Sequence, residues 1–177
     1  MTVIVIAGGL SHERDVSLRS GRRVAQALRA AGRTVVETDV NADLVELIRG
    51  TEAPVVVPML HGGLGEDGAL REVLEVLDVP FVGPTGASSR LTFDKSIATS
   101  VVRAAALAAP RQIALPHDIF RELGAPTLME SIGQQLGYPL IVKPSRSGSA
   151  LGVTKVDDPA SLPGALVAAY AYGAVAV

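Results

Sequence analysis

The 177-residue sequence contains no cysteine, which excludes disulfide bonds and thiol-based metal or redox chemistry. The net charge is only −2, so nothing indicates a broad electrostatic attraction to nucleic acid or to an anionic membrane. Any bound anion must therefore be held by a local site. The first residues lack a basic region, and their apolar run is too short for a secretory signal, so we expect a cytoplasmic protein.

Two common nucleotide-binding motifs are also missing. The sequence has no G-x-x-x-x-G-K-[ST] of a Walker loop, and no G-x-G-x-x-G follows its first apolar run. Residues 159–177 carry no charge, but Pro159, Pro163 and Gly164 interrupt them, and the apolar part is too short to span a membrane. We interpret this stretch as a buried helix that leads into a strand, and we expect no membrane and no nucleic-acid partner.

The composition suits a globular protein with a substantial core, since 48% of the residues are apolar and 19% are charged. Short apolar runs at 3–7, 34–38, 54–60 and 80–84 alternate with helical patterns at 16–31, 42–49 and 69–77. This alternation predicts an α/β fold whose N-terminal sheet is mostly parallel, with helices on both faces.

The pattern changes after a glycine-containing turn at 83–86. Here we predict helices at 94–108 and 127–136, two strands flanking the loop 144–152, a last helix after Asp158 and the start of a final strand. The second half is therefore expected to be a mixed α+β unit. These predictions divide the chain into residues 1–86 and 87–177.

The loop 144–152 follows a buried strand in the sequence "LIVKPSRSGSALGV", which ends at Lys143. Glycine and serine leave room for backbone N–H groups and hydroxyls to converge on an anion, and a lysine at the strand end adds a point charge. Phosphate is the expected ligand. The alternative is a solvated hairpin turn with a lysine at its edge, because glycine and serine are ordinary turn residues.

Two further glycine-containing stretches follow predicted parallel strands, at the sheet edge where α/β proteins bind ligands. In "GGLSHERDVSLRSG" (8–21), Ser11 is a predicted helix cap and Glu13 lies in the first turn of the helix. In "HGGLGEDG" (61–68), His61 stands at the end of a strand. Each residue also has a purely structural alternative. Glu13 would then only be stabilised by the helix dipole, and His61 would only form hydrogen bonds with the backbone.

The sequence resembles the D-alanine–D-alanine ligases of the ATP-grasp superfamily. The resemblance rests on four motifs in the order of the family, namely "GGLSHERDVSLRSG", "HGGLGEDGALREVLEVLDVPFVGP", "FDK" at 93–95 and "YPLIVKPSRSGSALGV". It implies that residues 1–86 form an N-terminal α/β substrate-binding domain. Residues 87–177 would then form the first ATP-grasp subdomain, incomplete at its C-terminal end.

The resemblance also implies a reaction and its residues. The family joins two D-alanines in an ATP-dependent reaction through an acylphosphate, for peptidoglycan precursors. By position, Glu13 would hold the ammonium group of the first D-alanine, and His61 would contact substrate near the reacting carboxylate. Lys95 and Lys143 would bind ATP phosphates. Ser149 would order the closed lid and link it to Glu13, which makes Glu13 and Ser149 the catalytic assignments.

The chain departs from the family pattern in places. Ser147 stands where many relatives carry glutamate, and Ala150 where many carry a second serine, so lid closure is expected to be altered. The magnesium ligands of the family would lie beyond Val177, so we expect ATP and magnesium as cofactors but no metal ligand in this chain, and no activity of the chain alone.

Several alternatives remain open at this point. The chain is expected to form a homodimer through its N-terminal domain, as family members do. A D-alanine–D-lactate ligase, or another ATP-grasp carboxylate–amine ligase, has a similar first half. From a different class, the chain could be a non-catalytic fragment that binds D-alanine or pairs with a partner subunit.

Overall fold

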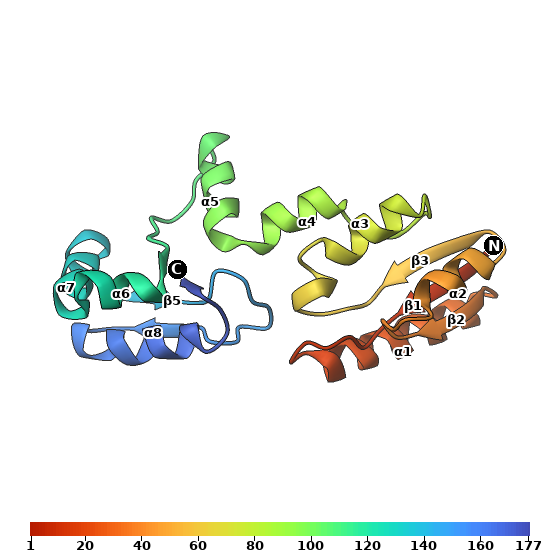
Figure 1. Ribbon diagram of the computed structural model, residues 1–177, viewed down its shortest axis with the longest axis horizontal. Helices are drawn as coiled ribbons and strands as arrows, with labels where there is room; N and C mark the ends of the chain where they lie inside the picture. The colour runs from red at the N-terminus through yellow and green to blue at the C-terminus, as the bar shows by residue number, and fades with distance from the viewer. The chain divides into compact units, whose positions relative to one another are not determined.

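The computed structural model describes residues 1–177, which form two compact units, Met1–Arg90 and Leu91–Val177 (Figure 1). The first unit is a parallel α/β unit and the second is mixed, as the sequence predicts. The two units meet between Arg90 and Leu91, within helix α4 (Gly86–Phe93).

The first unit contains a three-stranded parallel sheet in the order β2-β1-β3. Its strands are β1 (Thr2–Ile6), β2 (Thr34–Thr38) and β3 (Pro54–Pro58). In the register of the sheet, Val3 of the central strand pairs with Val35 on one side and Val55 on the other. A central parallel strand is covered on both faces, which explains why β1 is apolar and buried from Val3 to Ile6.

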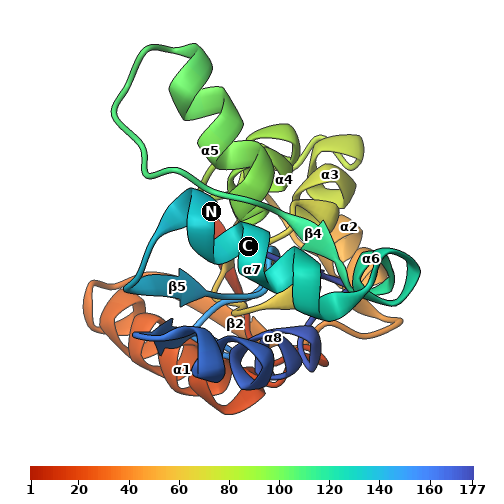
Figure 2. The ribbon, with the colours of Figure 1, turned by 90° about the vertical axis from the view of Figure 1, so that its left-hand side faces the viewer.

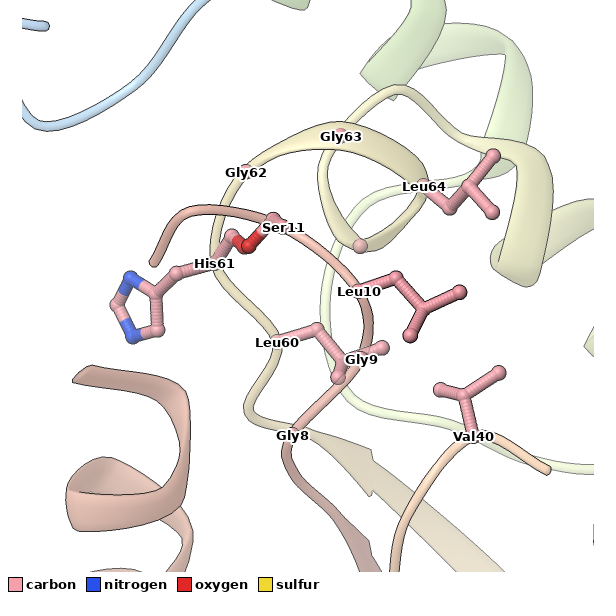
Figure 3. Close-up of a pocket in the computed structure, with 11 residues that line it drawn as sticks. Gly8, Gly9, Leu10, Ser11, Val40, Leu60, His61, Gly62, Gly63 and Leu64 are labelled. Carbon is pink, nitrogen blue, oxygen red and sulfur yellow. The ribbon is translucent and has the colours of Figure 1, made fainter. Parts of the chain in front are cut away.

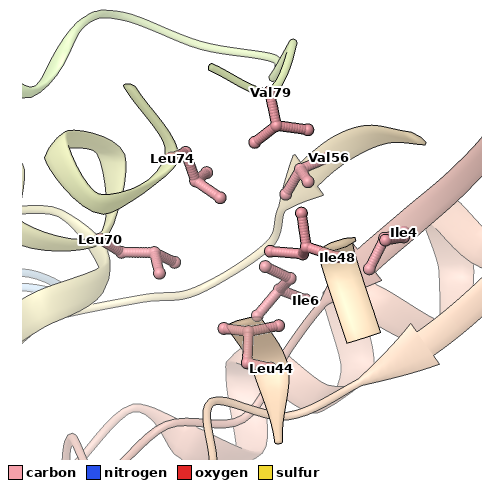
Figure 4. Close-up of a cluster of buried hydrophobic side chains, with 8 residues drawn as sticks. All are labelled: Ile4, Ile6, Leu44, Ile48, Val56, Leu70, Leu74 and Val79. Atoms are coloured by element: carbon pink, nitrogen blue, oxygen red, sulfur yellow. The ribbon is translucent and has the colours of Figure 1, made fainter. Parts of the chain in front are cut away.

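Helices cover both faces of this sheet, as predicted. On one face, Val3 and Val5 pack with Ala25 of α1 (Arg14–Ala30). The opposite face carries the helices α2 (Leu44–Gly50) and α3 (Ala69–Val76). The cluster between them and the sheet is drawn in Figure 4 and contains Ile4, Ile6, Leu44, Ile48, Val56, Leu70, Leu74 and Val79. Ile4 and Ile6 are 0% exposed, and burial on that scale contributes about 1.5–3 kcal/mol for each side chain.

The second unit is built on an antiparallel hairpin of β5 (Leu140–Val142) and β6 (Thr154–Val156), which confirms the two strands predicted around the loop. The helices α7 (Ala125–Leu136) and α8 (Leu162–Tyr170) pack against it (Figure 2). A short helical turn, η2 (Pro159–Ser161), precedes α8. The predicted final strand is β7 (Val175–Ala176), which pairs with β4 (Leu115–Pro116).

Some predicted elements differ in the structure. The strand expected at 80–84 is reduced to one bridge between Val56 and Phe81. The helix expected at 94–108 is α5 (Lys95–Ala104), and the chain leaves it at Ala106, which has a φ of 57°. Two helices, α4 and α6 (His117–Leu123), were not predicted. No helix has the length and apolar character needed to cross a membrane.

Candidate active site

The two loops that follow β1 and β3 lie side by side at the carboxyl edge of the parallel sheet. Together with Val40, they enclose a cavity of about 220 Å³ (Figure 3). The residues that line it are Gly8, Gly9, Leu10, Ser11, Val40, Leu60, His61, Gly62, Gly63, Leu64 and Gly65. The second loop includes a short helical turn, η1 (Gly63–Gly65). The structure thus brings together the two glycine-containing stretches on which the sequence analysis drew.

Ser11 joins these two loops. Its Oγ donates a hydrogen bond to the carbonyl of His61 (2.5 Å) and accepts one from the amide of Glu13 (3.1 Å). The prediction that Ser11 is the cap residue of α1 is wrong, because Glu13 occupies the N-cap position and makes no side-chain capping bond. The hydroxyl of Ser11 instead accepts a hydrogen bond from the N-cap residue itself and so holds the segment that precedes the helix.

The Glu13 side chain lies against the backbone of Gly62. Glu13 is only 6% exposed, and a Cβ added to Gly62 would stand 2.3 Å from its Oε2 atom. Gly62 also has φ 69° and ψ 165°, a conformation that is essentially restricted to glycine. Glycine at this position therefore makes room for the carboxylate of the neighbouring loop.

His61 faces a different direction from the apolar residues of the cavity. Its ring points away from Leu10 and Leu64 (Figure 3), and its Nε2 lies 3.2 Å from the hydroxyl of Ser20 on α1. The cavity therefore has an apolar side, while the imidazole and the carboxylate of Glu13 belong to its polar surroundings.

The second unit holds the predicted phosphate-binding residues. Lys143 directly follows β5, and its backbone amide and carbonyl both pair with Val177 (2.9 and 2.8 Å). Lys95 is the first residue of α5, and its Nζ donates to the carbonyl of Ser147 (2.7 Å). Both lysines therefore adjoin the base of the same loop, Lys143 through the chain and Lys95 through a hydrogen bond.

Ser149 lies in the exposed part of this loop. Its φ is 45°, and that of the following Ala150 is 57°, so the backbone turns sharply at the two positions. Two overlapping turns hold the segment together, because the Leu151 amide donates to the Gly148 carbonyl (3.0 Å) and the Val153 amide donates to the Ala150 carbonyl (3.2 Å). Ser149 and Glu13 belong to different units, so the link expected between them stays a prediction.

Comparisons with known proteins show the family of the chain. A family model described as "D-ala D-ala ligase C-terminus" matches residues 101–177. A D-alanine–D-alanine ligase of Desulforudis audaxviator (strain MP104C) is 41% identical over 98% of this chain, which covers 55% of that ligase. The chain belongs to the D-alanine–D-alanine ligase family.

The fold of the chain is shared with solved ligases of the family. The crystal structure of a D-alanine–D-alanine ligase from Bacillus anthracis matches 99% of the chain with a TM-score of 0.83 and 29% identity, and 56% of that protein is covered. The same ligase complexed with ATP matches with a TM-score of 0.82 at the same identity, covering 99% of this chain and 57% of that one. The chain spans about half the length of the curated relatives it matches.

Asp39, which supports the loop after β1, is not predicted from the sequence. Asp39, which directly follows β2, accepts hydrogen bonds from the Gly9 and Val40 amides (2.7 Å each) and pairs with Arg14 (2.6 Å). Burial acts to raise the pKa of this carboxyl, but the Arg14 guanidinium and the two amides outweigh it and hold the pKa below its usual value. The available signal was an aspartate at the carboxyl end of a parallel strand.

Proposed function

We propose that the chain provides the first-substrate site and the ATP-phosphate site of a ligase that joins two D-alanines. The observation that carries the proposal is the position of two lysines at the base of one loop of small residues. Lys143 directly follows the strand before the loop, and Lys95 is hydrogen-bonded to the carbonyl of Ser147 within the loop. The family of the chain and the ATP complex of a relative support this assignment.

In the first unit, Glu13 is assigned to the ammonium group of the first D-alanine. A carboxylate that lies against the backbone of Gly62 offers an acceptor to a cation, and Gly62 itself lines the neighbouring cavity. His61 is assigned to the substrate near its reacting carboxylate. Both residues come from loops at one sheet edge, which is where the amino acid is expected to sit.

In the second unit, Lys95 and Lys143 are assigned to the phosphates. An oxygen of the D-alanine carboxylate attacks the γ-phosphorus of ATP, the bond to the bridging oxygen breaks, and ADP leaves. The acylphosphate is then attacked at its acyl carbon by the amine of the second D-alanine, and phosphate leaves with the bonding electron pair as the amine loses a proton. The lysines stabilise negative charge during both steps, while the protein mainly orients the reactants.

Ser149 is assigned to lid closure over the nucleotide. Because residues 147–150 of the loop are only serine, glycine and alanine, closure of this part would displace little packed surface. Magnesium would neutralise further phosphate charge when bound. Residues 1–177 contain no group of three or more His, Asp or Glu that could hold a metal ion, so we assign no step to it.

The test is ligand binding by the 177-residue chain, followed by NMR amide shifts. D-alanine should shift the amides of Gly9 and Gly62 and should bind more tightly than L-alanine, and Glu13→Gln should remove this response. ATP should shift the loop 144–152. A chain that responds to neither ligand contradicts the proposal, and equal responses to both alanines contradict the assignment of a D-alanine site.

Further expectations from the family complete this proposal. A homodimer through the first unit is predicted, and light scattering of the purified chain measures it directly. The role in peptidoglycan precursor synthesis is tested by complementation of a ligase-deficient bacterium with a ligase of the family in which residues 1–177 replace the matching part. The proposal takes D-alanine as the second substrate, D-lactate is the alternative, and a competition assay between the two distinguishes them.

A further inference from the structure

Residues 93–95, at the start of α5, contact residues 145–147 at the base of the loop 144–152. Asp94 accepts a hydrogen bond through Oδ1 from the hydroxyl of Ser145 (2.6 Å). Lys95 donates from its amide to the carbonyl of Ser145 (2.9 Å) and from its Nζ to the carbonyl of Ser147 (2.7 Å). Residues 94 and 95 therefore hold the first part of the loop through both side-chain and backbone hydrogen bonds, and we call these contacts with Ser145 and Ser147 the grip.

A third contact lies beside these two. The guanidinium carbon of Arg146 stands 5.6 Å from the centre of the Phe93 ring, which is within range of a cation–π interaction. Ser145 itself is only 3% exposed, so its hydroxyl bond is protected from competition with water. The tripeptide "FDK" singled out in the sequence thus faces the consecutive residues 145–147.

Asp94 connects two structural elements through a single oxygen. The same Oδ1 that receives Ser145 also caps α5 by accepting from the amides of Ser96 (3.0 Å) and Ile97 (3.3 Å). The cap places Lys95 at the start of the helix, and Ser145 lies two residues after Lys143. The carboxylate therefore ties the element that carries one lysine to the segment that carries the other.

The ionic state of Asp94 favours such a role. Burial acts to raise the pKa of its carboxyl, but hydrogen bonds from Ser145 and from Ser96 and Ile97 outweigh this effect and keep the pKa below its usual value. The group is therefore an anion at neutral pH, and hydrogen bonds to an anionic acceptor are shorter and stronger than those between neutral groups.

We propose that Asp94 is a positioning residue of the phosphate site, which acts through Ser145 to hold the base of the loop against α5 and so fixes Lys95 relative to Lys143. The proposal rests on the proposed function, because it takes both lysines as phosphate ligands. A loop that is already held in place loses less conformational freedom when phosphate binds, and affinity rises accordingly.

The competing explanation is that Asp94 only caps α5. The chain offers variants that separate the two roles. Ser145→Ala removes the link to the loop and leaves the cap, whereas Asp94→Ala removes both. Asp158 provides the matched control, because its carboxylate caps η2 by accepting from the Ser161 amide (3.0 Å) and also accepts from the Ser161 hydroxyl (3.2 Å), away from the loop.

The experiment measures hydrogen exchange of single amides by NMR in the full 177-residue chain. The Lys95 amide reports on the grip, because it donates to Ser145, and the Ser96 amide reports on the cap. Ser145→Ala should raise exchange at Lys95 about tenfold, the usual scale of one hydrogen bond to a charged group, and leave Ser96 unchanged. Ser161→Ala should alter neither amide.

Two more variants test whether Asp94 acts through Ser145. Asp94→Asn keeps an acceptor oxygen but loses the charge, so exchange at Lys95 should fall between the native chain and Asp94→Ala. The double variant Asp94→Ala/Ser145→Ala should exchange at the rate of Asp94→Ala alone, because both changes break the same contact. Native exchange at Lys95 in Ser145→Ala, or fully additive effects in the double variant, would overturn the proposal.

The link to phosphate is measured with inorganic triphosphate by calorimetry at fixed ionic strength. Ser145→Ala should weaken binding several-fold through lost preorganisation, and Ser161→Ala should not. Unchanged affinity in Ser145→Ala would overturn the positioning role even if the grip is confirmed by exchange. If the native chain fails to bind triphosphate, the phosphate site of the proposed function is refuted, and the positioning role is refuted with it. The exchange data would still show whether Asp94 and Ser145 hold the loop.

Discussion

The close approach between Gly62 and Glu13 gives a prediction whose size can be worked out from the structure. In Gly62→Ala, the new Cβ would stand 2.3 Å from the Glu13 Oε2 atom, whereas ordinary contact begins near 3.4 Å. The carboxylate must therefore withdraw by about 1 Å. Inserting a methyl group into a densely packed site in this way lowers the free energy of unfolding by about 1–3 kcal/mol. Backbone strain adds to this cost, because the position is suited only to glycine.

Gly137 supplies the matched control for the strain. It has φ 78° and ψ 172°, nearly the conformation of Gly62 at 69° and 165°, and no atom lies within 4 Å of its potential Cβ. Gly137→Ala should therefore cost only the strain, of order 1–3 kcal/mol. Gly62→Ala should cost about 2–6 kcal/mol, and the difference between the two variants measures the collision with Glu13.

The assay is the free energy of opening, taken from amide exchange in the strands of the unit that carries each substitution, since the two units need not unfold together. In a Glu13→Ala background the 2.3 Å collision is gone and only an approach of 3.2 Å to the Ser11 Cβ remains, so adding Gly62→Ala should cost close to what Gly137→Ala does. Gly62→Ala should also abolish the response to D-alanine, which Gly137→Ala should leave intact. Equal costs for the two glycine substitutions in the native background would refute the reasoning.

Three further predictions follow from single side chains. Lys143→Met should weaken triphosphate binding at least about tenfold, and Lys155→Met, which removes a charge on β6, should have little effect in the same calorimetric titration. The lowered pKa of Asp94 makes its contribution to stability complete above its ordinary pKa of 3.8, with loss as pH falls through the native value, so Asp94→Asn should flatten acid unfolding curves. Burial raises the pKa of Tyr170, which donates to the Leu115 carbonyl (3.0 Å), to about 12. Ultraviolet titration should therefore show one late phenolate transition that Tyr170→Phe removes, and stability should fall as pH rises from about 10 towards 12.

The sequence predicts the parallel sheet well because β1 and β3 are short apolar runs that end near glycine or proline, and β2 is a β-branched segment placed between two helical patterns. It does not predict α4, since "GASSRLTF" has a glycine and two serines near its start and buries only Gly86 and Ser89. Such a segment has neither high helix propensity nor a clear apolar periodicity, so tertiary contacts determine that it is helical. The same holds at Ala106, where a good helix former adopts a positive φ after α5 ends.

The candidate site is predictable in its residues but not in its contacts. Glu13 and Lys143 can be found by their positions beside glycine- and serine-containing loops after strands. The support for these loops comes from Asp39 and Asp94, whose partners lie 30 and 51 residues away in the chain. An aspartate near a turn is ordinary in any sequence, so only the fold distinguishes these two from the others.

The loop after β1 and the loop 144–152 are held in place in the same way. Glycine and serine bury little apolar surface, so packing alone cannot hold either loop in place. In the first unit, Asp39 holds the Gly9 amide and the Arg14 guanidinium; in the second, Asp94 holds the Ser145 hydroxyl. A hydrogen bond to a carboxylate is directional, which apolar contact is not, so it fixes where backbone amides and lysines point. Loops that lack a core can thereby present an ordered set of polar groups, and the aspartates that hold them deserve mutation as much as the residues that meet the ligand.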